Sequence, residues 1–178
     1  MNQDMHTYSG KKFNPLNIES KDICIEDIAH ALSLLCRGGG HFPYFYSVGQ
    51  HSINCANEAK ARQLPTHIIL GCLLHDASEA YISDIIRPVK VHLTNYIELE
   101  NHIMQTIFQA FDLCINKQDW DMIKQIDDTM LEYELDMILS SKRKKAGKLY
   151  SQPCFKYLPF QEVETYFINL YQELYKKL

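Results

Sequence analysis

The chain has 178 residues, of which 46% are hydrophobic and 22% are charged, proportions typical of one globular domain with a single core. Its formal net charge of −4 at pH 7 argues against stable nucleic-acid binding through a strongly basic face, and favours a small-molecule partner. Neither a membrane-length apolar stretch nor a signal-peptide pattern is visible, so we expect a cytoplasmic protein without a membrane contact.

The first part of the chain divides into an arm and a helix. Residues 1–20 are polar and contain turn-forming residues, which predicts an extended arm in front of a helical core over 21–178. Apolar residues then recur at helical spacing over 25–35. Three glycines after Arg37 end this helix and predict a flexible loop.

The next two predicted helices carry histidines. Ser47 is a candidate N-cap for the first of them, and His51 falls on its apolar face. Thr66 is a candidate cap for the second helix, which carries His75 and Asp76 inside an apolar run. Burial of such a polar pair costs several kcal/mol unless a partner compensates it, and a metal ion binds both residue types.

Three amphipathic segments follow in the second half of the chain. They cover about 94–111, with Thr94 as a candidate cap, then about 119–139 and about 160–178. The cations at 142–145 are expected to be solvated at the end of the second of these helices.

The whole pattern predicts an all-α fold. No run alternates with period two for long enough to require a sheet, so we expect one compact helical bundle of about six or more helices over 1–178. Six scattered cysteines without a C-x-x-C pair are expected to be reduced thiols.

Histidine and aspartate recur on three of these helices in types that bind metals. His51, His75, Asp76 and Asp127 offer nitrogen and carboxylate ligands, which suit Co, Mn, Zn, Fe or Ni without selecting one. Asp127 lies on the apolar face of its helix, whereas Asp128 falls among charged neighbours, so Asp127 is preferred. Each residue alone is also explained as a hydrogen-bonded core histidine or as a capping or ion-paired aspartate.

Three motifs in this order give the chain a resemblance to a known family. They are Tyr46-Ser47-Val48-Gly49-Gln50-His51-Ser52, His75-Asp76-Ala77-Ser78-Glu79 and Lys124-Gln125-Ile126-Asp127, with Asp84 and Pro88-Val89-Lys90 after the second. The set resembles the HD-domain metal-dependent phosphohydrolases, and within them the bacterial 5′-deoxynucleotidases and small phage-type deoxynucleotide phosphohydrolases. The resemblance runs from about residue 28 to 135 and implies a single HD-type domain.

The resemblance also implies roles for particular residues. It implies that His51, His75, Asp76 and Asp127 ligate one divalent transition metal, that Glu79 and Asp84 line the reaction centre, and that Arg37 holds phosphate. Two further candidates for substrate contacts are His41 in the loop and Lys90. Without the resemblance, the carboxylates at 79 and 84, the arginine and the lysine are explained as solvated, capping or helix-end groups.

The implied activity is hydrolysis of a phosphate ester of a small nucleotide. The expected substrate is a deoxyribonucleoside 5′-monophosphate, with release of phosphate, and the expected assembly is a homodimer or larger homo-oligomer. Three alternatives stay open: a deoxynucleoside triphosphohydrolase, a non-catalytic nucleotide-binding module of the same fold, and a purely structural helical protein. Gly38 departs from the family pattern, because relatives that cut monophosphates often have a bulky aromatic directly after this arginine.

Overall fold

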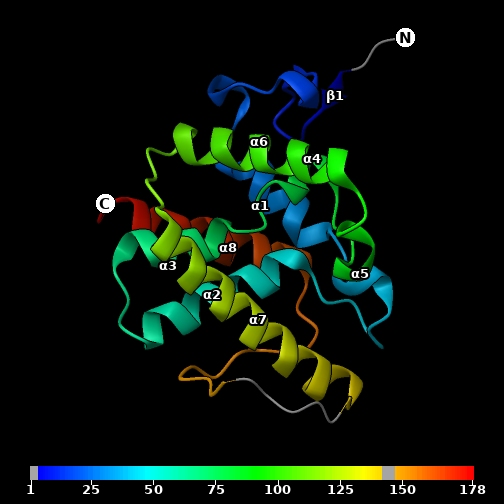
Figure 1. Cartoon of the computed structure of the whole chain (residues 1–178), viewed down its shortest axis with the longest axis vertical. Coiled ribbons are helices and arrows are strands. Elements are labelled where there is room, and N and C mark those ends of the chain that lie inside the picture. The colour runs from blue at the N-terminus through cyan, green and yellow to red at the C-terminus, as the bar shows by residue number, and fades with distance from the viewer. Residues whose placement is uncertain (1–3, 142–146) are drawn as a thin grey trace.

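Helices make up most of the structure, a computed structural model that describes residues 4–141 and 147–178 (Figure 1). The longer helices are α1 (Ile25–Leu34), α2 (Val48–Ala61), α3 (Thr66–Leu74), α6 (Thr94–Ala110), α7 (Lys117–Leu139) and α8 (Phe160–Tyr175). Two single-turn helices, α4 (Glu79–Ile82) and α5 (Arg87–Lys90), lie between α3 and α6. The all-α prediction is confirmed, although α8 ends before the last residue. The basic residues 142–145 lie outside the described part of the chain.

The N-terminal arm forms short local structure on top of the helices. Strands β1 (Met5–His6) and β2 (Lys12–Phe13) pair antiparallel, and two short 3-10 helices, η1 (Pro15–Asn17) and η2 (Ser20–Asp22), follow them. The backbone N–H and the hydroxyl of Ser9 donate to the Asp27 carboxylate at 2.6 and 2.7 Å. These bonds attach the arm to the first turn of α1.

Helix α3 lies at the centre of the bundle. Its residues 68–74 are all buried, and a helix that is apolar on every side belongs in the middle of a core. It packs against α2, α7 and α8. Gly71 permits the close approach of α7, because a Cβ at this position would lie only 2.5 Å from the Cδ1 atom of Ile123.

Helix starts agree with the sequence prediction in one of three cases. The Ser47 hydroxyl accepts a hydrogen bond from the Gln50 N–H at 3.1 Å and caps α2, as predicted. The predicted caps Thr66 and Thr94 are wrong, since both are the first residues of their helices and make no side-chain cap bond. Pro65 occupies the cap position before α3 with ψ 150°, and its ring fixes φ, so the following threonine already has helical geometry.

The helix that carries the histidine–aspartate pair is shorter than predicted. Helix α3 ends at Leu74, with His75 as its C-cap, and residues 75–78 form turns. The bonds from Ala77 N–H to the Leu74 carbonyl and from Glu79 N–H to the Asp76 carbonyl span three residues, at 2.9 and 3.0 Å. This tighter winding starts a new helix, so Glu79 lies on α4 and does not share a helix with His75.

Among the helices that the structure describes, none is long and apolar enough to cross a membrane. All six cysteines are free.

The two longest helices of the second half, α6 and α7, run on different sides of α3, and α8 passes behind it against α1 (Figure 1). This arrangement leaves the C-terminal end of α3 open toward α7 and the loop after α1, where the candidate site lies.

Candidate metal centre and cleft

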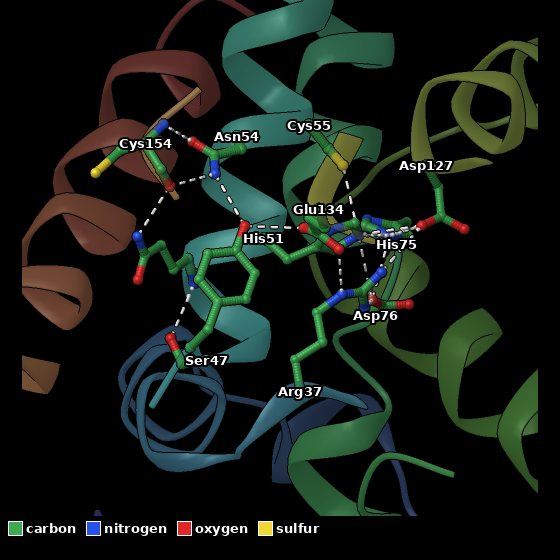
Figure 2. A network of polar contacts seen from close by, with 12 residues as sticks. Arg37, Ser47, His51, Asn54, Cys55, His75, Asp76, Asp127, Glu134 and Cys154 are labelled. Atoms are coloured by element: carbon green, nitrogen blue, oxygen red, sulfur yellow. Dashed lines mark hydrogen bonds and ion pairs between the residues drawn. The ribbon is translucent and has the colours of Figure 1, made fainter. Parts of the chain in front are cut away.

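Four of the residues expected at a metal site come together at the C-terminal end of α3. His51 projects from α2, His75 and Asp76 from the end of α3 and its turn, and Asp127 from α7 (Figure 2). The Nε2 atom of His51 lies 3.3 Å from the Nε2 atom of His75 and 3.1 Å from Oδ1 of Asp127. The Nε2 atom of His75 lies 3.3 Å from Oδ2 of Asp76. Ligands about 2.0–2.2 Å from one ion are about 3 to 3.6 Å apart, and these three separations fall in that range. Two others are longer, at 3.9 Å between His51 Nε2 and Asp76 Oδ2 and 3.8 Å between His75 Nε2 and Asp127 Oδ1.

Cys55 adds a sulfur atom to the same place. It lies one turn after His51 on α2, and its Sγ is 3.5 Å from the His51 Nε2 atom. The ligand-type atoms of His51, Cys55 and His75 all lie within 4.8 Å of one another, so this buried group can hold a metal ion. Sequence analysis treated the cysteine as a packed thiol, although its i+4 spacing from His51 was a usable signal.

Both imidazoles are oriented by a second hydrogen bond. The Nδ1 atom of His75 lies 2.8 Å from the Cys72 carbonyl oxygen, and the Nδ1 atom of His51 lies 2.6 Å from Oε1 of Glu134. A ring nitrogen bonded to an oxygen acceptor carries a proton, so in the neutral imidazole the other nitrogen has the lone pair that can bind a metal. In both histidines that other nitrogen is the Nε2 atom that faces the cluster.

The cluster concentrates opposite charges in a buried place. Burial alone would raise the pKa of Asp127, but hydrogen bonds from His51 and His75 hold this pKa well below its usual range. Burial would lower the pKa of His75, but the neighbouring Asp76 and Asp127 carboxylates raise it well above the ordinary value. The carboxylates are therefore ionised and stabilised by a positive partner, which a bound cation can also be.

Arg37 provides one such positive partner. Its side chain is only 11% exposed, and its Nε atom donates to Oε2 of Glu134 at 2.9 Å. Its Nη1 and Nη2 atoms lie 3.3 and 3.5 Å from the carboxylates of Asp76 and Asp127. The loop after α1 brings it here, because the Arg37 N–H bonds the Tyr46 carbonyl and the intervening loop folds back to the start of α2.

Glu134 was missed by sequence analysis. It is completely buried on α7 and bonds both His51 and Arg37. It lies seven residues after Asp127, two helical turns along the same face, which is the signal that could have found it.

A cleft of about 480 Å³ opens beside the cluster and contains most of the other predicted site residues. Its polar lining consists of Arg37, His41, Asp76, Glu79, Asp84, Arg87, Lys90 and Asp127, and its apolar lining includes Phe42, Ile85, Ile86, Leu131 and Leu135. His51 and His75 are buried and do not line the cleft. The cleft therefore joins candidate metal ligands, acids and cations in one place.

Glu79 is a buried carboxylate of the cleft with one unbonded oxygen atom. Its Oε2 atom is buried and has no hydrogen-bond partner within the described part of the chain. Burial, and then the charges of Asp76 and Asp84, raise the pKa of Glu79 well above its usual value. Burial is also the main reason why the pKa of Asp84 is raised. Carboxyl groups with raised pKa values can exchange protons nearer to neutral pH.

The remaining predicted contacts lie at the rim. His41 is exposed on the loop, and the Lys90 amine pairs with Glu100. Gly38 has φ +67°, and a Cβ there would meet the Cζ atom of Phe42 at 3.4 Å. The Phe42 ring thus occupies the space beside Gly38 on the cleft wall.

Asp128 lies farther out than Asp127. The Asp127 side chain is 17% exposed and the Asp128 side chain 42%. Arg87, which sequence analysis did not single out, bonds both: its Nη2 atom donates to Oδ2 of Asp127 at 3.1 Å and its Nη1 atom to Oδ1 of Asp128 at 2.6 Å. Within the described part of the chain, only Asp127 of these two carboxylates also contacts His51.

Two bacterial proteins are similar to the chain in sequence. No protein-family model matches the chain. It is 31% identical over 153 residues to the uncharacterized protein RCAP_rcc00048 of Rhodobacter capsulatus, an alignment that covers 82% of this chain and 78% of that protein. The chain belongs to the family of this protein. It is also 40% identical over 107 residues to the uncharacterized protein YfdR of Escherichia coli K12, covering 60% of this chain and 57% of that relative.

Proposed function

We propose that the protein is a cytoplasmic metal-dependent phosphohydrolase of the HD-domain type that acts on small nucleotides. The observation that carries the proposal is the cluster of His51, His75, Asp76 and Asp127 beside a cleft that also contains Arg37. Two imidazoles and two carboxylates are a ligand set for a divalent transition metal such as Co, Mn, Zn, Fe or Ni. In this set Cys55, one turn after His51 on α2, is a neighbour of the ligands and not one of the four.

The cleft residues have complementary parts in such a reaction. The metal, when bound, supplies positive charge to the phosphoryl oxygens and makes water more acidic. Glu79 accepts the proton of the attacking water at Oε2, the buried atom without a partner, and Asp84 is the second acid–base group. The Nη atoms of Arg37 donate to phosphate oxygens once the oxygens of Asp76 and Asp127 are engaged elsewhere.

The substrate that fits best is a single deoxyribonucleoside 5′-monophosphate, which is cleaved to the nucleoside and phosphate. The cleft volume of about 480 Å³ lies within the usual range for small-molecule sites. Arg87 and Lys90 add positive charge to the cleft lining, which suits an anionic nucleotide, and Phe42 with Leu131 offers an apolar wall for the sugar and base.

Product identification tests this proposal. Purified protein is incubated with dAMP or dATP in the presence of Co²⁺, Mn²⁺ or Zn²⁺, and the products are identified by phosphorus NMR, with EDTA as the control. We expect metal-dependent release of orthophosphate from dAMP. Release of triphosphate from dATP would instead establish the triphosphohydrolase alternative. A nucleotide that binds and stays intact would establish a non-catalytic module.

A further inference from the structure

We infer that Glu134 is a positioning residue that orients a metal ligand and the phosphate-binding arginine at the same time, an inference that rests on the proposed function. One carboxylate oxygen of Glu134 contacts the histidine and the other contacts the arginine. Oε1 lies 2.6 Å from Nδ1 of His51, and Oε2 accepts from Nε of Arg37 at 2.9 Å. The residue itself is fully buried and does not line the cleft, so it acts through these two neighbours.

The first contact determines which nitrogen of His51 can bind a metal. An ionised carboxylate only accepts hydrogen bonds, so the proton of the neutral imidazole stays on Nδ1. The Nε2 lone pair then faces His75 and Asp127, whose ligand-type atoms are 3.3 and 3.1 Å away. Carboxylate partners of this kind fix the ring orientation of metal-binding histidines and raise their affinity for the metal.

The second contact determines where the guanidinium points. Because Nε of Arg37 is bonded to Glu134, the planar group turns its two Nη atoms toward the carboxylates of Asp76 and Asp127. Arg37 also lines the cleft, so the fixed fork is presented at the edge where a phosphate would enter. One buried side chain thus sets the relative positions of the metal ligand and the phosphate donor.

A network behind Glu134 restricts its own movement. The Tyr46 hydroxyl donates to Oε1 at 2.8 Å and receives a bond from the Asn54 amide at 3.0 Å (Figure 2). The same amide donates to the Cys154 carbonyl at 2.9 Å. Three donors therefore converge on the Glu134 carboxylate, from His51, Arg37 and Tyr46.

This convergence makes glutamine a poor substitute despite its identical shape. An amide has one oxygen acceptor, and its NH₂ group can only donate. If the oxygen faces His51, the NH₂ group opposes the Nε–H of Arg37. If it faces Arg37, the NH₂ group forces the His51 proton to Nε2 and blocks the metal-binding nitrogen. The Glu134→Gln variant therefore loses one of the two functions in either orientation.

The test compares Glu134→Gln with Glu58→Gln, a matched control. Glu58 is also a fully buried carboxylate that pairs with an arginine, Arg62, but it lies outside the cluster and the cleft. Co²⁺ affinity is measured by following the visible absorption of the cobalt-loaded protein, inorganic phosphate affinity by calorimetry, and folding by the thermal midpoint. Because the amide keeps only one of the two contacts, we expect Glu134→Gln to weaken either Co²⁺ binding, about 10- to 100-fold, or phosphate binding, with Glu58→Gln unchanged in both.

The outcomes separate this inference from the proposed function. Wild-type affinity for both Co²⁺ and phosphate in Glu134→Gln, or an equal loss in Glu58→Gln, would overturn the positioning role. Failure of the wild-type protein to bind Co²⁺ at all would contradict the proposed function itself. A measurement without a variant serves if Glu134→Gln does not fold: long-range nitrogen NMR of the Zn²⁺-loaded wild type should place the His51 proton on Nδ1, and a proton on Nε2 would overturn the inference.

Discussion

At the scale of single residues, the carboxylates of the site differ in the direction in which their pKa values are displaced. Asp76, Asp127 and Glu134 each contact Arg37 or a histidine, and their pKa values are lowered despite their burial. Glu79 is also buried, but its pKa is raised, because burial and then the negative charges of Asp76 and Asp84 oppose its ionisation. Neighbouring carboxyl groups with pKa values displaced in opposite directions are a common basis for separate roles in catalysis.

Glu79 should therefore control both the rate and its dependence on pH. As a base it must be ionised, and its pKa is raised above the ordinary value of about 4.3, so kcat/KM should fall as the pH decreases through this raised pKa. Glu79→Gln should lower kcat by about 10²- to 10⁴-fold and remove this acidic limb. Glu98→Gln, which changes an exposed glutamate on α6, is the control for pH–rate measurements. An unchanged profile in Glu79→Gln would exclude this role.

Cys55 offers a test of which atoms bind the metal. If the carboxylates complete the ligand set, Cys55→Ser should bind Co²⁺ as the wild type does, and the wild-type spectrum should lack a thiolate-to-cobalt charge-transfer band. Cys72→Ser, which changes a buried cysteine on α3, controls for loss of a packed sulfur. A charge-transfer band that disappears only in Cys55→Ser would show that sulfur is a ligand.

At the scale of helices, the sequence predicts segments well and their junctions poorly. Ser47 and the apolar face of α2 predict both a helix and an inward His51, because an N-cap and a 3.6-residue period are local signals. The end of α3 at Leu74 is not predictable in this way, since the apolar run and the downstream residues are equally compatible with one longer helix. The end of such a helix depends on contacts between segments that are distant in sequence.

The difference between local signals and contacts between distant segments also explains which site residues the sequence predicts. Asp127 is distinguished from Asp128 by its place on the apolar face, which the sequence shows. The role of Glu134 depends on partners 83 and 97 residues away, His51 and Arg37, and no local pattern announces such pairs. The i+7 spacing from Asp127 places Glu134 on the same helix face, but its pairing with His51 and Arg37 is visible only in three dimensions.

The connection between α7 and α8 is attached to α2 by a buried glutamate. The buried Glu58 of α2 accepts hydrogen bonds from the backbone N–H groups of Tyr150 and Ser151, from the Ser151 hydroxyl and from Arg62. Burial opposes its ionisation, but these bonds lower the pKa of Glu58 below its usual value. We expect Glu58→Gln to lose about 1 to 3 kcal/mol of unfolding free energy at pH 7.

The pH dependence of this loss follows from the lowered pKa. A glutamate whose pKa is lowered in the folded state stabilises the fold fully at pH values above its unfolded-state pKa of about 4.3. This contribution is lost as the pH falls through the pKa of the folded state. The stability difference between wild type and Glu58→Gln should thus be largest near pH 7 and shrink below about pH 4. Urea unfolding over this range measures it, and a difference that grows in acid would contradict the assignment.

At the scale of the whole molecule, the candidate metal site connects parts of the chain that are far apart in sequence. Its residues come from α2, from the end of α3 and from α7, with Arg37 from the loop after α1. A metal that binds only this folded arrangement must stabilise the whole fold by mass action. The bundle and the site are therefore linked thermodynamically.

This linkage predicts a shift in thermal stability. At free Co²⁺ 100-fold above its dissociation constant, the folded state gains about 2.7 kcal/mol, or about 5 to 11 °C in Tm for a domain of this size. Differential scanning calorimetry with added Co²⁺ and with EDTA measures this shift. His75→Ala serves as the control and should show no metal-dependent shift, whereas an equal shift in that variant would place the ion elsewhere.

The central claim is that a metal at this cluster hydrolyses a nucleotide phosphate, and Co²⁺-dependent release of orthophosphate from dAMP by Asp127→Asn and Asp128→Asn tests it most directly. Both residues are adjacent on α7 and both bond Arg87, so loss of either carboxylate disturbs that arginine similarly. Only Asp127 is also 3.1 Å from His51 Nε2. We predict background activity for Asp127→Asn and near wild-type activity for Asp128→Asn. Wild-type release by Asp127→Asn, or no release by the unmodified protein with any of the metals, would contradict the account.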